Sequence, residues 1–375
     1  MKIMLYCQHV LGIGHFFRSM EVARALDRHE VLFVEGGDPL DGFTPPHHVK
    51  RSFLPPLMMD AEFSRVESRL GDVEAIKNER RQLLMSYFLG FSPDVLLIEL
   101  FPFGRKQFHS ELMPVLEMIQ AQGLPVGVVC SLRDILVEKE DRAAYEERVL
   151  GILNTCFHLL LVHADPRVIS LAETFERVSD IRIPFHYTGF VAREAPARER
   201  FHENRVIVAS SGGGKVGTEV LASTVSAVRR MPDDDLRLRV FLGPYMESAD
   251  RALISDLASP DSRISLCPFS TDFLRELAKA DLSISMAGYN TCMDILSARV
   301  KALVYPFPQN REQQMRAEKL EKLGLLTILR SLETEPLALT IQNALENRHT
   351  TPSTALDLNG SRNTARAIEK HFEKH

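Results

Sequence analysis

Three consecutive glycines, Gly212, Gly213 and Gly214, separate a β-branched run from an amphipathic stretch. We expect a strand over Arg205–Ser210 and a helix over Thr218–Met231 on either side of this turn. Glycine lets the backbone approach a ligand closely, and the free N–H groups of a helix N-terminus attract anions. The turn, with Ser211 and Lys215, is therefore predicted to bind a diphosphate, although a tight turn without a ligand has the same pattern. The spacing matches neither a Walker A loop nor a dinucleotide fingerprint.

A second glycine turn follows another expected strand, Leu282–Ser285. In Ala287-Gly288-Tyr289-Asn290-Thr291, glycine permits a tight turn, and either Asn290 or Thr291 can cap the helix that follows. Asp294 would then lie about one turn inside that helix, where carboxylates of nucleotide-binding folds accept hydrogen bonds from ribose. An acid in the first turn that only favours the helix dipole is the equal alternative.

Paired amides occur after a third strand end, in Tyr305-Pro306-Phe307-Pro308-Gln309-Asn310-Arg311-Glu312-Gln313-Gln314. Gln313 and Gln314 can each donate to and accept from sugar hydroxyls. Ordinary helix polarity is the alternative explanation for such a pair.

The N-terminal loop Gln8–Ser19 contains glycines around a histidine, Gly12-Ile13-Gly14-His15, after the strand expected over Lys2–Cys7. Imidazole, with an ordinary pKa near ~6.5, is suited to general base chemistry. We favour that role for His15 over simple packing at the helix start, with His9 as a weaker competitor.

Short apolar runs alternate with amphipathic stretches along the whole chain, which predicts parallel sheets covered by helices. We expect an α/β protein with two Rossmann-like domains whose sheets face an interdomain cleft. The predicted parts are a domain over residues 1–190, a linker over 191–204, a second domain over 205–358 and a C-terminal helix over 359–375 that packs on the first domain. In the first domain we expect strands at residues 31–35, 94–100, 125–131 and 159–163, and helices at 21–26, 80–89, 112–120 and 141–153. The proline-rich stretch Phe43–Met59 is predicted to lack regular structure.

Composition narrows the class of protein further. The formal net charge is −5 with interspersed signs, which argues against nucleic acid as a partner. No apolar run approaches the ~20 residues of a membrane span, and no signal peptide is visible. The five cysteines lack metal or redox spacing, so we expect reduced, buried thiols and a cytoplasmic protein.

In this order, the glycine turn, the Ala-Gly-x-x-Thr-x-x-x-Asp motif and the Gln pair resemble the C-terminal domain of GT-B glycosyltransferases, especially family 28. Thr188-Gly189-Phe190-Val191-Ala192-Arg193 is similar to the interdomain motif of that family. The resemblance implies an inverting, metal-independent transfer of a sugar from a UDP-sugar. It places the glycine turn and Arg193 at the diphosphate, Asp294 at the ribose, and Gln313 and Gln314 at the sugar. Gly14 would also lie on the donor side. The family usually has Glu where this chain has Asp294, which leaves the ribose contact in doubt.

The same resemblance makes His15 the base that deprotonates an acceptor hydroxyl, with Glu99 and Asp134 as alternatives. Other polar strand ends of the first half resemble a little-described bacterial subgroup of the family and would form the acceptor side: Arg18, Phe103, Arg105 and Arg133. The acceptor itself is not identified. Some members of the family use lipid-linked acceptors, which implies that this protein contacts the inner face of the membrane peripherally. The segment Phe53–Met59 is apolar enough for such contact, although a buried loop explains that segment equally well.

Two patterns that suggest metal binding are set aside. Asp233-Asp234-Asp235 lies in an expected polar turn, and His47-His48 has no partner ligands at metal spacing. We therefore predict no metal and no cofactor other than the UDP-sugar substrate. The alternatives are a nucleotide-sugar epimerase on the same fold and a non-catalytic nucleotide-sugar-binding protein.

Overall fold

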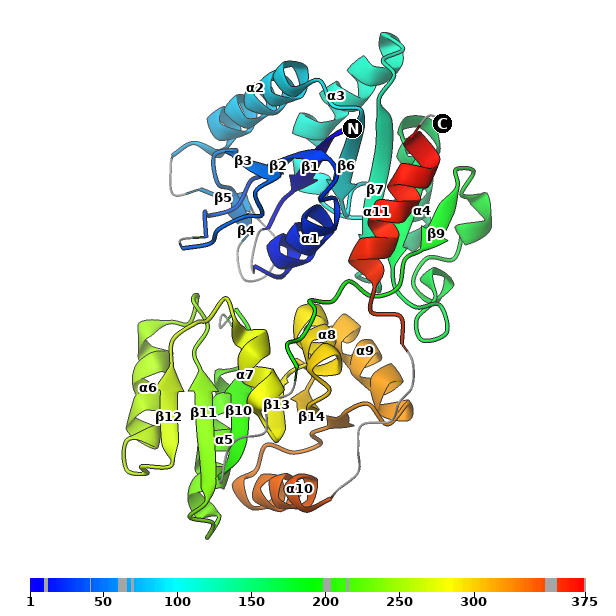
Figure 1. Cartoon of the computed structure of the whole chain (residues 1–375). Helices are drawn as coiled ribbons and strands as arrows, with labels where there is room; N and C mark the ends of the chain where they lie inside the picture. Colours follow the sequence, from blue (N-terminus) through cyan, green and yellow to red (C-terminus); the bar gives the residue numbers. More distant parts are fainter. Residues whose placement is uncertain are drawn as a thin grey trace. The chain divides into compact units, whose positions relative to one another are not determined.

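The computed structural model describes residues 1–9, 13–40, 42–59, 66–68, 71–197, 204–213, 216–347 and 356–373. Contacts between residues divide the chain into two units (Figure 1). Unit 1 comprises Met1–Val191 and Leu356–His375, and unit 2 comprises Ala192–Ala355. Among the described residues, no helix is long and apolar enough to cross a membrane.

Unit 1 is built on a seven-stranded parallel sheet with the order β3-β2-β1-β6-β7-β8-β9. Its strands β1, β2, β6, β7 and β8 are almost entirely buried, as expected for apolar runs covered on both faces. The strands are β1 (Lys2–Cys7), β2 (Glu30–Glu35), β3 (Val49–Phe53), β6 (Val95–Glu99), β7 (Gly127–Arg133), β8 (Leu159–His163) and β9 (Phe185–Tyr187); β4 (Met58–Met59) and β5 (Val66–Glu67) form a separate antiparallel pair.

Five helices pack on this sheet, and each α-helix that follows a strand returns the chain for the next parallel strand. Asp72 and Asp141 accept hydrogen bonds from the first turns of α2 and α4, and so begin these helices. The helices are α1 (Gly14–Ala25), α2 (Val73–Phe91), α3 (His109–Ala121), α4 (Arg142–Cys156) and α11 (Gly360–Phe372), with 3₁₀ turns at Lys106–Phe108, Leu171–Glu173 and Val178–Asp180.

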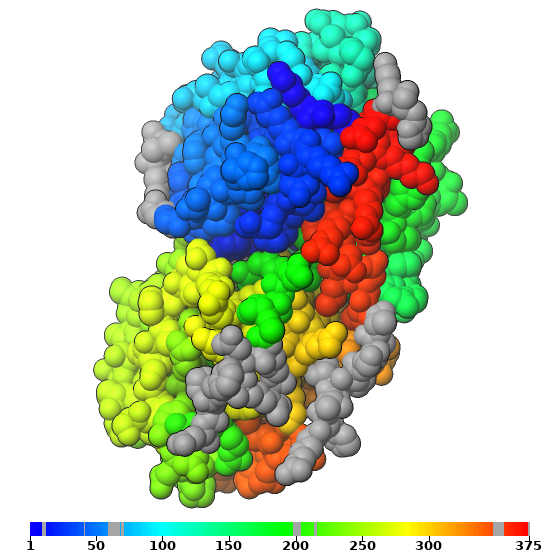
Figure 2. Space-filling model, viewed as in Figure 1, coloured from blue at the N-terminus to red at the C-terminus, as the bar shows by residue number. Residues whose placement is uncertain are grey.

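The C-terminal helix α11 belongs to unit 1, where it packs beside α1 (Figure 2). Ala365 and Ile368 join the core cluster that contains β1 and α1 side chains. The chain is held at the entry to α11 by backbone hydrogen bonds from Phe190 N to Asp357 O and from Gly360 N to Phe190 O. At the other end of α11, Gly127 leaves room for the Phe372 ring, which lies 2.3 Å from the position a Cβ would take.

Unit 2 is a second parallel sheet with the order β12-β11-β10-β13-β14-β15. Side chains of β10, β11 and β13 pack against α5 and α10 in one core. The strands are β10 (Arg205–Ser210), β11 (Leu236–Phe241), β12 (Ile264–Cys267), β13 (Leu282–Met286), β14 (Lys301–Tyr305) and β15 (Thr327–Ile328). The helices are α5 (Thr218–Arg230), α6 (Ser248–Ala258), α7 (Phe273–Lys279), α8 (Tyr289–Ala298), α9 (Arg311–Lys322) and α10 (Thr334–Glu346).

Two expectations for unit 1 are wrong. Phe43–Met59 contains the regular strand β3, because Pro45, Pro46, Pro55 and Pro56 flank Val49–Phe53 rather than interrupt it. Helix α1 begins at Gly14, seven residues before the expected start at Glu21, so His15 and Arg18 lie in the helix and not in the preceding loop. Polar residues and glycine in this first turn hide the apolar helical period.

Candidate functional site

Ligands of parallel α/β sheets bind outside the carboxyl ends of the strands, where the strand order reverses. In unit 1 the order reverses between β1 and β6. Glu99 ends β6, and His15 lies in the first turn of the helix that follows β1. The topology therefore brings these two predicted residues together.

His15 and Glu99 form a hydrogen-bonded pair. The distance from His15 Nδ1 to Glu99 Oε1 is 2.7 Å, and the His15 side chain is 21% exposed while that of Glu99 is 1% exposed. We assign the proton to Nδ1, because the carboxylate can only accept; Arg18 Nη2, which lies 3.1 Å from the same nitrogen, then donates to Glu99 and not to His15. Burial lowers the pKa of His15 to about 3, so its imidazole is neutral at pH 7.

Two arginines hold the Glu99 carboxylate. Arg18 donates to Oε1 at 2.5 Å, and Arg105 donates to Oε2 at 3.3 Å. Burial alone raises the pKa of Glu99, but hydrogen bonding to His15 and the charges of Arg105 and Arg18 outweigh it and hold the pKa well below its usual range. Glu99 is therefore a carboxylate at pH 7 that orients His15. Arg18 and Arg105, which are predicted to lie on the acceptor side, donate hydrogen bonds to this carboxylate.

The remaining predicted residues of unit 1 differ in burial. Asp134 is fully buried and accepts a hydrogen bond from Ile135 N at 2.9 Å. Phe103 is buried against Phe175, with ring centroids 5.2 Å apart. Arg133 is half-buried at the end of β7. Gly14 is the first residue of α1.

A buried polar network that sequence reasoning missed supports the loop after β1. Arg80 of α2 is fully buried and donates to both oxygens of Glu111 at 2.7 Å, to Gln8 Oε1 at 2.6 Å and to the carbonyl of Gly36 at 3.0 Å. Tyr6 donates to Glu111 Oε1 at 2.5 Å. Arg80 lies in an Arg- and Glu-rich helix whose sequence resembles an exposed face, so only the spatial approach of Glu111 reveals the network.

In unit 2 the order reverses between β10 and β13, and both predicted donor turns follow these two strands. Helix α5 begins after Gly217, and α8 begins after Gly288; among the described residues neither helix has a side-chain cap. Two helix N-termini without a side-chain cap among the described residues thus begin at the reversal of one sheet, which is an arrangement suited to a diphosphate.

The first turn is described at Ser211, Gly212 and Gly213, while Gly214 and Lys215 lie outside the described residues. Gly212 has φ +69°, a conformation that favours glycine, and a Cβ there would meet no atom within 4 Å. The Ser211 hydroxyl is buried and has no hydrogen-bond partner among the described residues. A ligand oxygen at this turn would satisfy it.

The second turn is held by a residue that we did not predict. Arg316 of α9 is 2% exposed, donates to the carbonyl of Ala287 at 3.2 Å, and lies 5.4 Å from the centroid of the Tyr289 ring. Asn290 and Thr291 are half-buried in the first turn of α8. The signal in the sequence is weak, because Arg316 lies in a strongly charged helix.

Arg193 and Asp294 contact each other. Arg193 Nε donates to Asp294 Oδ1 at 3.1 Å, and the guanidinium also donates to the carbonyl of Thr271 at 3.1 Å. Burial raises the pKa of Asp294 despite the opposing charge of Arg193. The backbone of Arg193 accepts a hydrogen bond from Ser297 of α8 at 2.6 Å, so this part of the predicted linker is packed on α8. The expected separate contacts, diphosphate for Arg193 and ribose for Asp294, stay predictions.

The amide pair begins α9. Asn310 caps the helix by accepting from Gln313 N at 3.0 Å, and Gln313 Oε1 accepts from Phe307 N at 3.2 Å. Gln314 donates to Glu318 at 2.5 Å. Among the described residues, the Nε2 group of Gln313 has no hydrogen-bond partner, so it can donate to a ligand.

Comparison with known proteins agrees with this geometry. Residues 212–371 match the model of the glycosyltransferase family 28 C-terminal domain. A UDP-N-acetylglucosamine--N-acetylmuramyl-(pentapeptide) pyrophosphoryl-undecaprenol N-acetylglucosamine transferase from Rhizobium leguminosarum bv. trifolii is 26% identical over 127 residues. That match covers 33% of this chain and 34% of the relative, so the chain aligns with about a third of the relative's length.

Two solved structures share the fold over nearly the whole chain. MurG from Acinetobacter baumannii has a TM-score of 0.58 at 16% identity, with 98% of this chain and 99% of that chain covered. A UDP-N-acetylglucosamine 2-epimerase candidate from Listeria monocytogenes has a TM-score of 0.65 at 16% identity, with 100% and 97% covered. The predicted GT-B fold and the resemblance to family 28 are confirmed.

Proposed function

We propose that this chain, a family 28-like protein of the GT-B fold, transfers a sugar from a UDP-sugar to a hydroxyl acceptor with inversion at the anomeric carbon. The observation that carries the proposal is the pair of glycine-capped helix N-termini, α5 and α8, at the strand-order reversal of unit 2. Unit 2 binds the donor, and unit 1 supplies the group that activates the acceptor.

The donor diphosphate is bound by backbone N–H groups of the turn after β10 and of the first turn of α8. The Ser211 hydroxyl donates to the same diphosphate, and this hydrogen bond satisfies a buried hydroxyl that otherwise has no partner among the described residues. Fixed N–H dipoles stabilise the charge that develops on the departing diphosphate. In this scheme the protein's own groups perform the charge role that a metal has in other transferases.

The half-buried polar groups around α8 and α9 bind the sugar and the ribose. Asn290 and Thr291 contribute from the start of α8, and Gln313 from the start of α9. Arg193 fixes the Asp294 carboxylate, and Asp294 in turn orients the segment after Ala192 along α8. A ribose hydroxyl that donates to Asp294 would share this carboxylate with Arg193.

His15 removes the acceptor proton. Its Nδ1–H bond to Glu99 leaves the Nε2 lone pair available, and its side chain is partly exposed. The acceptor oxygen bonds to the anomeric carbon, the bond from that carbon to the diphosphate breaks, and the electron pair leaves with UDP. The acceptor proton passes to Nε2, and the Glu99 carboxylate stabilises the imidazolium that forms.

Calorimetry with UDP, UMP, uridine and the diphosphates of the other bases tests the donor site in the full chain. We expect UDP to bind more tightly than UMP, because the second phosphate gains the N–H groups of both turns. The Ser211→Ala variant should weaken UDP binding roughly tenfold or more, the value of a hydrogen bond to a charged group. Ser283→Ala removes another buried hydroxyl that has no hydrogen-bond partner among the described residues; it lies near the start of β13, and the change should leave UDP affinity unchanged. Absence of binding by any nucleoside diphosphate refutes the proposal.

A second function has a specific observation in its favour. The Listeria monocytogenes structure has a TM-score of 0.65 and bears the name of a UDP-N-acetylglucosamine 2-epimerase. Incubation of this chain with UDP-N-acetylglucosamine in the absence of acceptor, followed by NMR of the sugar protons, distinguishes an epimerase from a transferase. A change of configuration at C2 with the diphosphate bond intact would establish the epimerase. Tight UDP binding without turnover across an acceptor panel would instead establish a binding protein.

We further propose that the protein lies in the cytoplasm, at the inner face of the membrane when its acceptor is lipid-linked; the name of the Rhizobium relative gives a pyrophosphoryl-undecaprenol acceptor for that protein. Within Phe53–Met59, Leu54 and Leu57 are buried in unit 1, whereas Phe53 is 41% exposed. These burials favour the buried-loop explanation for most of the segment. Flotation of the purified chain with anionic vesicles measures whether membrane contact occurs.

A further inference from the structure

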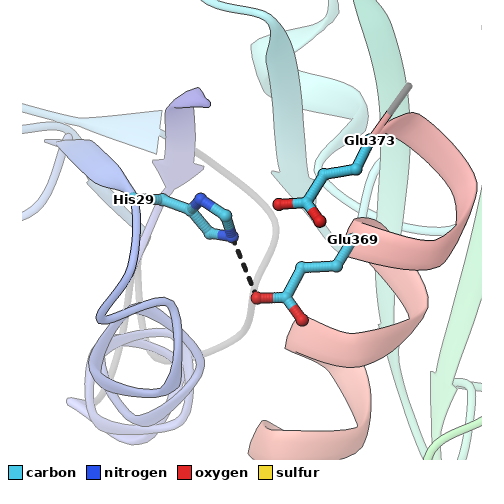
Figure 3. Close-up of side chains that lie close together, drawn as sticks. All are labelled: His29, Glu369 and Glu373. Carbon is cyan, nitrogen blue, oxygen red and sulfur yellow. Dashed lines mark hydrogen bonds and ion pairs between the residues drawn. The ribbon is translucent and has the colours of Figure 1, made fainter. Parts of the chain in front are cut away.

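A histidine and two glutamates converge in unit 1 far from the strand ends described above (Figure 3). His29 lies in the turn between α1 and β2, while Glu369 and Glu373 lie one helical turn apart at the end of α11. His29 Nε2 lies 3.1 Å from Glu369 Oε1, and one potential ligand atom of each residue lies within 4.8 Å of the others. The His29 side chain is 3% exposed, and that of Glu369 is 25% exposed.

The two carboxylates occupy an unfavourable position for negative charge. Like charges four residues apart on a helix repel, and the C-terminal end of a helix dipole disfavours anions. Among the described residues, no lysine or arginine forms an ion pair with Glu369 or Glu373, and the N-terminal ammonium of Met1 lies 3.4 Å from the other ring nitrogen, His29 Nδ1. A cation between the carboxylates and the imidazole would remove both penalties.

We propose that His29, Glu369 and Glu373 form a binding site for one divalent transition-metal ion, with Zn²⁺ as the ion of best fit. One imidazole nitrogen and two carboxylate oxygens are a donor set that Zn²⁺ accepts, with water in the remaining position. Mg²⁺ prefers oxygen ligands alone in octahedral geometry and is disfavoured here. Ligands of tetrahedral Zn²⁺ lie roughly 3.4 Å apart, so the exposed Glu373 side chain moves inward on binding.

The site joins segments that are 340 residues apart in sequence. Bound metal would crosslink the turn before β2 to the last turn of α11, and so stabilise the docking of α11 on unit 1. The site is separate from the proposed sugar transfer and takes no part in it.

Metal binding is tested on the untagged, full-length chain after treatment with chelator. Calorimetry with Zn²⁺ should give one site per chain, and Co²⁺ should give visible absorption bands of a bound, low-symmetry ion. Glu373→Gln keeps the His29–Glu369 contact and changes only an exposed side chain, so the variant should fold normally and bind Zn²⁺ at least tenfold more weakly. His29→Ala should abolish the Co²⁺ bands.

Two matched variants serve as controls. His371→Ala removes an exposed histidine from α11, and Glu335→Gln removes an exposed acid from another helix; both should keep the affinity of the parent chain. The proposal is overturned if Zn²⁺ does not bind the parent chain, or if Glu373→Gln binds it as tightly as the parent does. Loss of binding in His371→Ala would overturn it as well.

Discussion

Replacement of Gly217 by alanine tests whether the start of α5, at the proposed donor site, requires glycine. Gly217 precedes α5 and has φ +93°, a conformation that L-residues rarely adopt. A Cβ there would lie 2.3 Å from Met286 Sδ and 3.2 Å from Ser211 Cβ. Met286 ends β13, so this contact joins the two turns at the strand-order reversal.

The expected cost has two parts. Alanine in a left-handed conformation costs about 1–2 kcal/mol. Crowding of a packed core costs about 1–3 kcal/mol more, because Met286 is 5% exposed and has little room to move. A loss of about 3 kcal/mol would lower the Tm of unit 2 by roughly 6–12 °C.

Chemical denaturation and calorimetry measure the loss, and a double-mutant cycle separates its parts. Met286→Ala removes the crowding but not the backbone strain, so Gly217→Ala should cost only about 1–2 kcal/mol in that background. Gly151→Ala, inside α4 with no atom within 4 Å of the added Cβ, is the matched control and should stabilise by about 0.5–1 kcal/mol.

The reasoning is refuted if Gly217→Ala unfolds at the temperature of the parent chain. A cost that is the same with and without Met286→Ala would show that the crowding component is wrong. UDP affinity should fall in Gly217→Ala, because the strain shifts the N-terminus of α5.

Three further outcomes are expected. His15→Ala should lower the rate of transfer roughly 10²–10⁴-fold without change in UDP affinity, and an unchanged rate would exclude this base. Burial lowers the pKa of His15 and His163 to about 3, so between pH ~6.5 and 3 the unfolded chain binds protons that the native chain does not, and stability falls as the pH falls. His163→Gln should reduce the slope of unfolding free energy against pH by up to about 1.4 kcal/mol per unit; an unaltered slope would contradict the assignment. Transfer by Glu373→Gln, in which the proposed zinc site is weakened, should persist in EDTA, and loss of transfer would demonstrate a metal at the reacting centre.

The parts of the fold that the sequence predicts well are those with a continuous local signal. The bounds of β1, β8 and β10 agree with the predicted ranges, because each is an apolar run between turn residues. Strand β3 is missed because prolines lie on both sides of it and its three central residues are all polar, and β9 is missed because it is only three residues long. Helix α1 starts at Gly14 without a side-chain cap, so no local signal marks its beginning.

In the candidate site too, local features could be predicted from the sequence and long-range pairings could not. The two donor turns could be located because strand, glycine and helix follow each other directly in the chain. Pairings across the fold could not: Arg193 meets Asp294 across 101 positions, and Arg80 meets Glu111 across 31 positions. Such contacts depend on which elements pack against each other in the fold, and the residue types alone do not predict this packing.

The placement of α11 in unit 1 has a consequence for synthesis. Residues 192–355 form an uninterrupted unit, so they can complete their core as soon as they leave the ribosome. Unit 1 cannot complete its core until α11 is made, because Ile368 joins the core cluster that contains α1 side chains and Phe372 packs at Gly127. The half of the protein that is translated first is therefore the half that finishes folding last, and a ribosome stalled before residue 356 would present an incomplete apolar surface to chaperones.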